Sequence, residues 1–537
     1  MNHLKAIRHQ FLTVLLLIIV LVSLGLRVIN LGEKVYWVDE VSTSLRVSGY
    51  TRQALIQDLS QRDSITIQEL KQYQQLNPDR NWKDTISALT QSPEHAPLYF
   101  ILLRIWQQIF GSSILATRTL SVSLNVLCFP LLYILCLELF KVVEVGKVAV
   151  TLFAVSPFFM AYAQEARPYS LWMLTLLLSS LTLLKVIRLN HPKSWLAYTL
   201  SLILGLYTSL FSGFTLISST LYILTLKKLK LTKLVKNYSV YSGLGLLAFL
   251  PWMMIIILNW RQLQDNTTWV KAPMEFLPKV AIFIYSISIL FFDFLSSEQP
   301  SLFVIILGSL LTIFVLGLIT FACYFLYQKT PPSIGLFVFC LILVNPLLLF
   351  LIDGISQGQA SATSRYLIPC YLGLLLAVAY LLATQIFDFH SIKKRRFWRF
   401  ILILILSVGL ISCILYQEAV PIYQKGRNRH NLTIARLINQ SKSPALITET
   451  QQIFDILSLS YHLNPNLKVY LLPQTDLEQI LNPDQSLLLF NPSSLLKDTI
   501  NQEGQFNLDE IYKPDLLTPN DRYLALWKIK KVQNPIR

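Results

Sequence analysis

Eleven long apolar runs constrain the fold of this chain more than any other feature of its sequence. A helix needs about 20 predominantly apolar residues to cross the hydrocarbon core of a bilayer. Of the 537 residues 53% are hydrophobic and only 14% are charged, whereas soluble domains are about one quarter charged. We therefore predict a polytopic all-α membrane protein with about eleven transmembrane helices. The runs cover residues 11–29, 116–140, 147–162, 168–188, 195–210, 212–227, 238–258, 301–327, 333–353, 366–387 and 400–420.

Basic residues lie in short clusters between these runs. Lys5 and Arg8 precede the first run, and the sequence Lys-Lys-Arg-Arg at 393–396 precedes the last. Loops rich in Lys and Arg stay in the cytoplasm, which predicts a cytoplasmic N-terminus and an external location for everything beyond about residue 421. This clustering also accounts for the net charge of +16. We therefore expect a lipid bilayer, and not nucleic acid, beside these residues.

The remaining segments divide the chain into two predicted domains. Residues 1–420 form the membrane domain, with a long first external loop at 30–112 that ends in an amphipathic helix at 97–112. Residues 278–295 are apolar but break the charge pattern as a full crossing, so we expect a re-entrant or surface helix there. Residues 421–537 are polar and predict a small external α/β domain. Its expected strands are 445–448, 468–472, 486–490 and 523–527.

Unusual polar residues flank the external ends of several predicted helices. They are Asp39-Glu40, Glu94-His95, Gln164-Glu165-Ala166-Arg167 and Ser364-Arg365-Tyr366. Acids and cations near a bilayer are costly unless they face water, a partner or a substrate. Because these motifs share one side of the membrane in the predicted topology, we expect a convergent polar site there.

Each motif has a structural interpretation beside the functional one. Asp39 and Glu40 fit a solvated pair at a helix N-terminus, and they also fit a general base that deprotonates an acceptor. Glu94-His95 fits a loop end before a helix, or a ligand for a phosphate. Arg167 and Arg365 fit side chains that reach for the membrane interface. They also fit cations that hold a phosphate, a task that suits the donor fork of Arg.

The motifs WVDE (37–40), EHAPLYF (94–100), LFAVSPFFMAYAQEARPYSL (152–171) and SRYLIP (364–369) resemble those of C-type (GT-C) glycosyltransferases. In particular they are similar to bacterial protein O-mannosyltransferases and aminoarabinose transferases. The resemblance covers about residues 8–420 and implies the GT-C fold, a bacterial inner membrane location and a periplasmic C-terminal domain. It also implies inverting, metal-independent transfer from a polyprenyl-phosphate sugar, with no cofactor, to a lipid, protein or glycan acceptor.

The resemblance also implies roles for individual residues. Asp39 takes the place of the catalytic acid, with Glu40 as its neighbour in the catalytic group. His95, Arg167 and Arg365 become the expected ligands of the donor phosphate. The chain departs from the pattern at two positions: Ala96 replaces the usual second proline, and His95 stands where the aminoarabinose enzymes carry a lysine. The expected substrate-binding residues are Trp37, Glu94, Tyr99, Glu165, Tyr169 and Tyr366.

Two alternatives remain open at this point. A flippase or transporter for a polyisoprenoid lipid predicts charges deep within several helices, or broken helices in two related halves. Asp293 and Asp353, the few acids near apolar runs, both lie near segment ends. An O-antigen-type polymerase or ligase would place its key residues in a large late external loop, whereas here the acids lie in the first.

Overall fold

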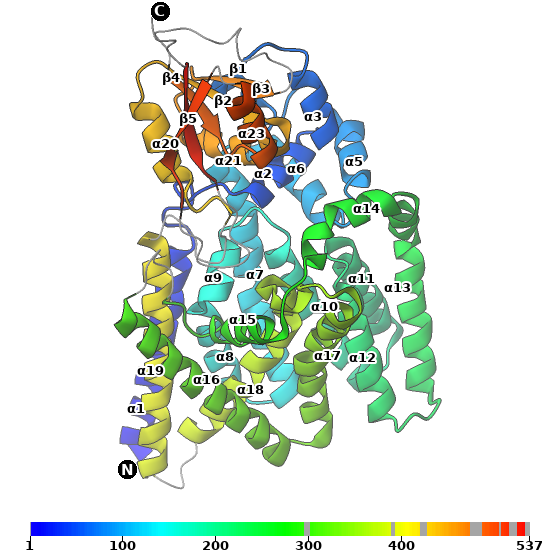
Figure 1. Ribbon diagram of the computed structural model, residues 1–537. Coiled ribbons are helices and arrows are strands. Elements are labelled where there is room, and N and C mark those ends of the chain that lie inside the picture. The colour runs from blue at the N-terminus through cyan, green and yellow to red at the C-terminus, as the bar shows by residue number, and fades with distance from the viewer. Residues whose placement is uncertain are drawn as a thin grey trace, which may run out of the picture.

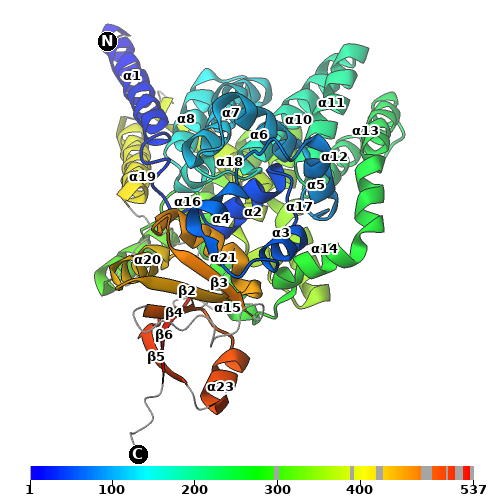
Figure 2. The same ribbon diagram turned by 90° about the horizontal axis from the view of Figure 1, so that it is seen from above.

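The computed structural model describes residues 2–294, 301–387, 392–418, 427–472, 486–503, 506–514 and 524–531. Most of them are helical, and they form a bundle of long helices with a β-sheet at one end (Figure 1). We call the end that carries the sheet and residues 30–112 the sheet end. The N-terminus lies at the opposite end of the bundle, and Figure 2 shows the helices of residues 30–112 beside the sheet.

Within the described residues, seven helical segments are long and apolar enough to cross a membrane, or up to eight if a bent pair counts as one span. Predicted runs 195–210 and 212–227 form α11 (Pro192–Thr208) and α12 (Ser212–Leu226), which are 17 and 15 residues long. At 1.5 Å per residue α12 measures only about 22 Å, against a hydrocarbon core of about 30 Å. The structure therefore supports a multi-pass helical protein, while the count of eleven stays a prediction. The seven segments are α7 (Ile114–Phe140), α10 (Tyr169–Leu189), α13 (Lys233–Leu258), α16 (Leu302–Lys329), α17 (Pro332–Ser356), η3 (Ser364–Leu367) with α18 (Ile368–Phe387), and α19 (Ile392–Glu418).

The crossing predicted at 147–162 is broken into α8 (Val143–Ala154) and α9 (Pro157–Ala163) with a bend of 63°, and the pair is still apolar and long enough to count as one span. Pro157 is the first residue of α9 and has no amide hydrogen to continue α8. The break leaves carbonyl groups at the end of α8 without helical partners. Arg27 from the end of α1 (Asn2–Leu26) donates to the carbonyls of Ala154 (3.1 Å) and Phe153 (3.4 Å).

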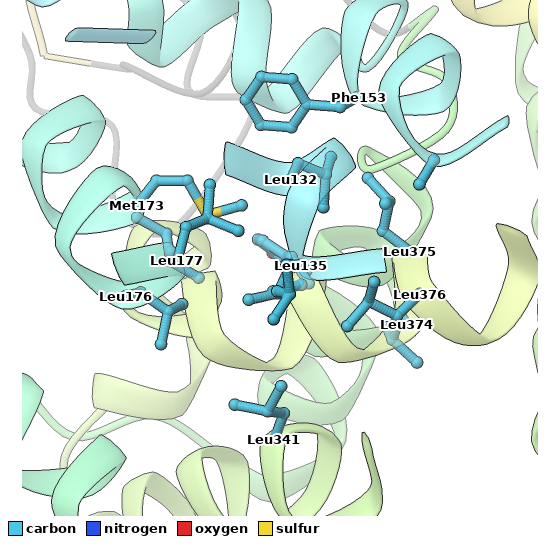
Figure 3. Close-up of a cluster of buried hydrophobic side chains, with 14 of the residues drawn as sticks. Leu132, Leu135, Phe153, Met173, Leu176, Leu177, Leu341, Leu374, Leu375 and Leu376 are labelled. Atoms are coloured by element: carbon cyan, nitrogen blue, oxygen red, sulfur yellow. The ribbon is translucent and has the colours of Figure 1, made fainter. Parts of the chain in front are cut away.

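Helix α18 is the centre of the bundle, since 89% of its apolar window is buried. Figure 3 shows leucines of α18 meeting apolar side chains of α7, α10 and α17, with Phe153 of α8 beside them. Lipid tails are as apolar as these side chains, so close packing rather than escape from water holds such helices together.

Residues 30–112 fold into short helices at the sheet end. Their apolar faces pack on one another and on the C-terminal region. The helix expected at 97–112 is present as α6 (Leu98–Phe110), while its place on the membrane surface stays a prediction. The region predicted at 278–295 overlaps α15 (Phe276–Ser288), which is too short to cross alone. The elements of the first loop are α2 (Val38–Val47), α3 (Arg52–Leu59), β1 (Ile65–Thr66), α4 (Ile67–Gln72), α5 (Trp82–Thr90) and α6 (Leu98–Phe110).

The C-terminal region forms a six-stranded sheet of order β1-β3-β2-β4-β6-β5. β2 (Pro444–Glu449), β3 (Lys468–Leu472) and β4 (Ser486–Phe490) lie at three of the expected runs, and β2 is parallel to both of the others. β6 (Leu526–Lys531) lies three residues later than the expected strand at 523–527, whose first residue is outside the described part. β5 (Phe506–Tyr512) was not predicted, because only its first residue is buried. The helices around the sheet are α20 (Asn431–Gln440), α21 (Ile453–Leu459) and α23 (Ser494–Glu503).

The edge strand β1 comes from the first loop and not from the C-terminal region. It pairs antiparallel with β3, Ile65 opposite Val469. One apolar core also joins Tyr36, Val41 and Leu45 to residues of α20, α21 and the sheet. Two segments some 390 residues apart therefore pack as one unit at the sheet end, and this unit carries α2.

Candidate active site

Helix α2 brings the two carboxylates of the WVDE motif to the sheet end. Trp37 is extended (ψ 168°) and immediately precedes the helix, so Asp39 and Glu40 lie in its first turn. Carboxylates are favoured there because the first amides of a helix point outward and carry partial positive charge. The two side chains nevertheless have very different surroundings.

Glu40 is fully buried and paired with Arg118 of α7. Arg118 donates to both of its oxygens at 2.8 and 2.7 Å, and the backbone amide of Ala166 donates to it at 2.8 Å. Arg118 also donates to the carbonyls of Leu31 and Val35. The expectation of a solvated carboxylate pair is therefore wrong for Glu40. This group ties the start of α2 to α7 and to the turn before α10, and it does not face solvent.

Asp39 keeps 27% of its side chain exposed, and two arginines converge on it. Its Oδ2 lies 3.9 Å from Nη2 of Arg167 and 3.9 Å from Nη2 of Arg365. Arg167 is held in place by donating to the backbone carbonyl of Asp39 (3.2 Å) and to Thr43 Oγ1 (3.0 Å). The ion pairs to the carboxylate are longer than hydrogen bonds. The carboxylate and both guanidinium groups therefore meet at a partly open point.

Aromatic rings surround Arg365. Its guanidinium carbon lies 5.2 Å from the ring centre of Trp269, 5.7 Å from that of Tyr366 and 5.9 Å from that of Trp37. Cation–π contacts of this kind orient a guanidinium without using up its N–H donors. The ring of Tyr366 packs in turn on that of Phe211, with 4.3 Å between the ring centres. The motifs around residues 37 and 365 therefore meet, as predicted.

Glu94 and His95 complete the polar group. Glu94 Oε1 lies 3.8 Å from Arg46 Nη2 and 3.6 Å from His95 Nε2, and Asn266 of α14 (Trp260–Asn266) donates to both its oxygens at 3.1 Å. Burial, and then the positive charges of Arg46, Arg167 and Arg365, hold the pKa of His95 well below its usual value of 6.5. His95 is therefore neutral at pH 7, so its predicted contact with a phosphate would use an imidazole N–H and not a positive charge. That contact stays a prediction.

Arg46 supplies a positive charge that the sequence reading missed. Burial lowers its pKa to about 10, while Glu94 opposes that change, so the side chain stays charged at pH 7. Arg46 lies seven residues after Asp39, two turns along the same face of α2. This seven-residue spacing could have placed Arg46 beside Asp39 from the sequence alone. Three arginines now face two carboxylates, Asp39 and Glu94, around a neutral histidine.

Three predicted residues lie behind this group. Tyr99 is fully buried and its hydroxyl is within 2.7 Å of Ser121 Oγ, so it does not line the site. Glu165 is 1% exposed in the turn before α10. Tyr169 is 8% exposed, with its ring centre 5.9 Å from the guanidinium carbon of Arg167. Tyr99 and Glu165 are therefore too buried to open onto the site, whereas Tyr169 contacts Arg167.

A separate cavity lies between α10, α11 and α12. Hydroxyl groups of Thr175, Ser201, Ser212 and Thr215 line it, and none of the motif residues does. In the part of the chain that the structure describes, no cluster of three or more His, Cys, Asp or Glu residues could hold a metal ion. Metal independence stays a prediction, because it is a property of the reaction and has to be measured as activity.

Comparisons with known proteins agree with the motifs. Residues 94–255 match the family model described as dolichyl-phosphate-mannose-protein mannosyltransferase, a span that includes Glu94, His95, Arg118 and Arg167. No curated protein matches the sequence.

Among solved structures, the Archaeoglobus fulgidus oligosaccharyltransferase in its apo form matches with 11% identity and a TM-score of 0.49, over 84% of this chain and 64% of that one. The chain thus spans less than two thirds of the archaeal protein. ArnT from Cupriavidus metallidurans, bound to undecaprenyl phosphate, matches with 12% identity and a TM-score of 0.45, over 96% of this chain and 97% of that one. By its motifs and by the match over residues 94–255, the chain is similar to the C-type glycosyltransferases.

Proposed function

We propose that this protein transfers a sugar from a polyprenyl-phosphate-linked donor to an acceptor hydroxyl or amine, with Asp39 as the general base. The observation that carries the proposal is the partly exposed Asp39 carboxylate, 3.9 Å from both Arg167 and Arg365. The family matched over residues 94–255 is described by a lipid-phosphate sugar donor, which supports this class of donor.

The arginines are the proposed ligands of the donor phosphate. Three guanidinium groups against two carboxylates leave one positive charge in excess, because His95 is neutral. Arg presents a planar fork of N–H donors that matches the oxygens of a phosphate. Fixed donors of this kind stabilise the charge that develops on a leaving phosphate, and they do so best where water is excluded.

Asp39 is the proposed base in a single displacement. The acceptor oxygen or nitrogen forms a bond to the anomeric carbon while the bond from that carbon to the phosphate oxygen breaks. The acceptor proton passes to the Asp39 carboxylate, and polyprenyl phosphate leaves as an anion held by Arg167 and Arg365. Attack opposite the leaving group inverts the anomeric centre. In this proposal the sheet end faces the outside of a bacterial inner membrane, and the acceptor is a lipid, a protein or a glycan.

The decisive experiment incubates purified protein with a panel of polyprenyl-phosphate sugars and measures released polyprenyl phosphate. We expect release with at least one donor, in the presence of EDTA. Asp39→Asn should lower kcat about 10³-fold, within the range for loss of a general base. The matched control is Asp79→Asn, which makes the same change on an exposed carboxylate of the same loop. Absence of release with every donor would contradict the proposal and favour a lipid transporter.

A further inference from the structure

The helix that carries Asp39 does not cap its own N-terminus. The neighbouring helices α3, α4 and α5 are each preceded by a capping residue, Thr51, Thr66 and Asn81, whose side chain accepts a hydrogen bond from an amide of the first turn. The residue before α2 is Trp37, whose side chain makes no such bond. An indole has one donor and no acceptor, so it is unable to cap.

The missing cap is supplied by the C-terminal region. The amide of Val38, the first residue of α2, donates to Oδ1 of Asn428 at 3.0 Å across 390 residues of sequence. Asn428 is 1% exposed. An asparagine is among the best capping residues when it precedes a helix, and here the same group acts from another part of the chain.

The orientation of Asn428 is itself determined by hydrogen bonds. Its Nδ2 donates to Asp455 Oδ1 at 3.1 Å, which leaves Oδ1 to face Val38. Arg427 holds both oxygens of Asp455 at 2.8 and 2.6 Å. Asp455 lies in α21, which packs against α2, and Ser458 of the same helix donates to the Tyr36 carbonyl at 2.6 Å. The cap is therefore part of a rigid contact.

We propose that Asn428 is a positioning residue for catalysis, because it caps α2 and thereby holds Asp39 at its place between Arg167 and Arg365. The role of Asp39 in this statement rests on the function proposed above. Asp39 is the second residue of α2, so it lies in the turn that frays first when a cap is lost. Arg365 stacks on Trp269 and Tyr366, which lie outside α2, whereas Arg167 donates to the Asp39 carbonyl. Loss of the cap should therefore weaken donor binding less than it lowers kcat.

The test compares Asn428→Ala with the double swap Asn428→Asp/Asp455→Asn. The alanine removes the acceptor for the Val38 amide. The swap keeps an acceptor there, exchanges which partner carries the charge and leaves the net charge unchanged. The single change Asn428→Leu keeps the size of the side chain, also removes the acceptor, and should behave like the alanine variant. The matched control is Asn439→Ala in α20, which removes two hydrogen bonds, to His462 and Asn464, in the same region without touching α2.

Two measurements distinguish the role of Asn428 as a cap from the proposed transferase function. Hydrogen–deuterium exchange of residues 38–41 reports the cap whether or not the protein is active, and it should speed up in Asn428→Ala but not in Asn439→Ala. Steady-state transfer should show kcat lowered roughly tenfold or more, since small displacements of a reacting group cost up to about 10²-fold. KM for the donor should change by a smaller factor, because Arg365 is placed from outside α2. The swap should restore exchange and kcat to near the wild-type values.

Each outcome decides one statement. Unchanged exchange in Asn428→Ala, or in Asn428→Leu if the alanine variant does not fold, would overturn the cap. Faster exchange with unchanged kcat would overturn the positioning role. A swap variant that folds with a restored cap but stays as slow as the single variants would overturn it as well. Suppose that the wild-type protein transfers no sugar while residues 38–41 still exchange faster in Asn428→Ala than in Asn439→Ala. That result would overturn the proposed function, and with it the role of the cap in catalysis, but it would leave the cap itself in place.

Discussion

Asp39 and Glu40 are neighbours in the first turn of α2, yet their arginines bind them in opposite ways. Glu40 has no exposed surface and meets Arg118 at 2.7 Å, whereas Asp39 is 27% exposed and meets Arg167 and Arg365 at 3.9 Å. A buried carboxylate with every contact satisfied holds elements together, while a partly open one with long contacts is able to change partners. Adjacent acids of one motif therefore differ in their surroundings: Glu40 is buried in the fold, and Asp39, the partly exposed one, has the proposed catalytic role.

The largest expected effect separates these two roles. Glu40→Gln removes one charge of a buried pair and leaves Arg118 uncompensated, so the free energy of unfolding should fall by about 3–5 kcal/mol. Asp39→Asn acts on a partly exposed group and should change the free energy of unfolding by less than ~1 kcal/mol. Thermal unfolding of both purified variants measures the difference. Equal loss of stability in the two would remove the distinction between the carboxylates.

An intermediate effect is expected at the arginines of the open site. Arg365→Lys keeps the charge but loses the planar fork and the stacking on Trp37 and Trp269. Affinity for polyprenyl phosphate should weaken about tenfold, equivalent to about 1.4 kcal/mol. Titration of the detergent-purified variant with polyprenyl phosphate measures it. Arg436→Lys, an exposed arginine of α20, is the control and should bind as the wild type does.

The smallest effect concerns His95 and pH. Its pKa is lowered in the folded protein by burial and by three arginines, so between that value and about 6.5 the unfolded chain binds more protons than the folded one. Stability should therefore fall as pH drops below about 6.5, with a slope of at most about 1.4 kcal/mol per pH unit. His95→Gln should flatten this slope in melts between pH 5 and 7. A slope equal to that of the wild type would show that His95 is not its source.

Local patterns predicted the helices and most of the sheet. The runs at 116–140 and 168–188 became α7 and α10 within a few residues, and the short runs at 445–448 and 468–472 became β2 and β3. These elements follow from apolar periodicity, which is a property of neighbouring residues. β1 was out of reach of that reasoning, because two residues become a strand only when β3 is there to pair with them.

The sequence predicted which residues gather at the site better than it predicted which of them contact one another. The motifs at 37–40, 94–95, 167 and 365 do converge, as their shared side of the predicted membrane indicated. Which carboxylate is buried, and which cation faces the other, depends on contacts between α2, α7 and the turn before α10. Arg46 was missed, although it lies two turns from Asp39 on the same face of α2.

By itself the sequence determined a multi-pass helical chain, its short β-runs and the set of polar residues gathered at one end, because hydropathy and spacing are local properties. The tertiary structure alone decided that Asp39 stays open while Glu40 is buried, that Arg27 closes the bend between α8 and α9, and that Asn428 caps α2. Each of these depends on one hydrogen-bonding group meeting another from a distant part of the chain. Burial makes such a partner necessary, and only the packing of the helices determines which group is within reach.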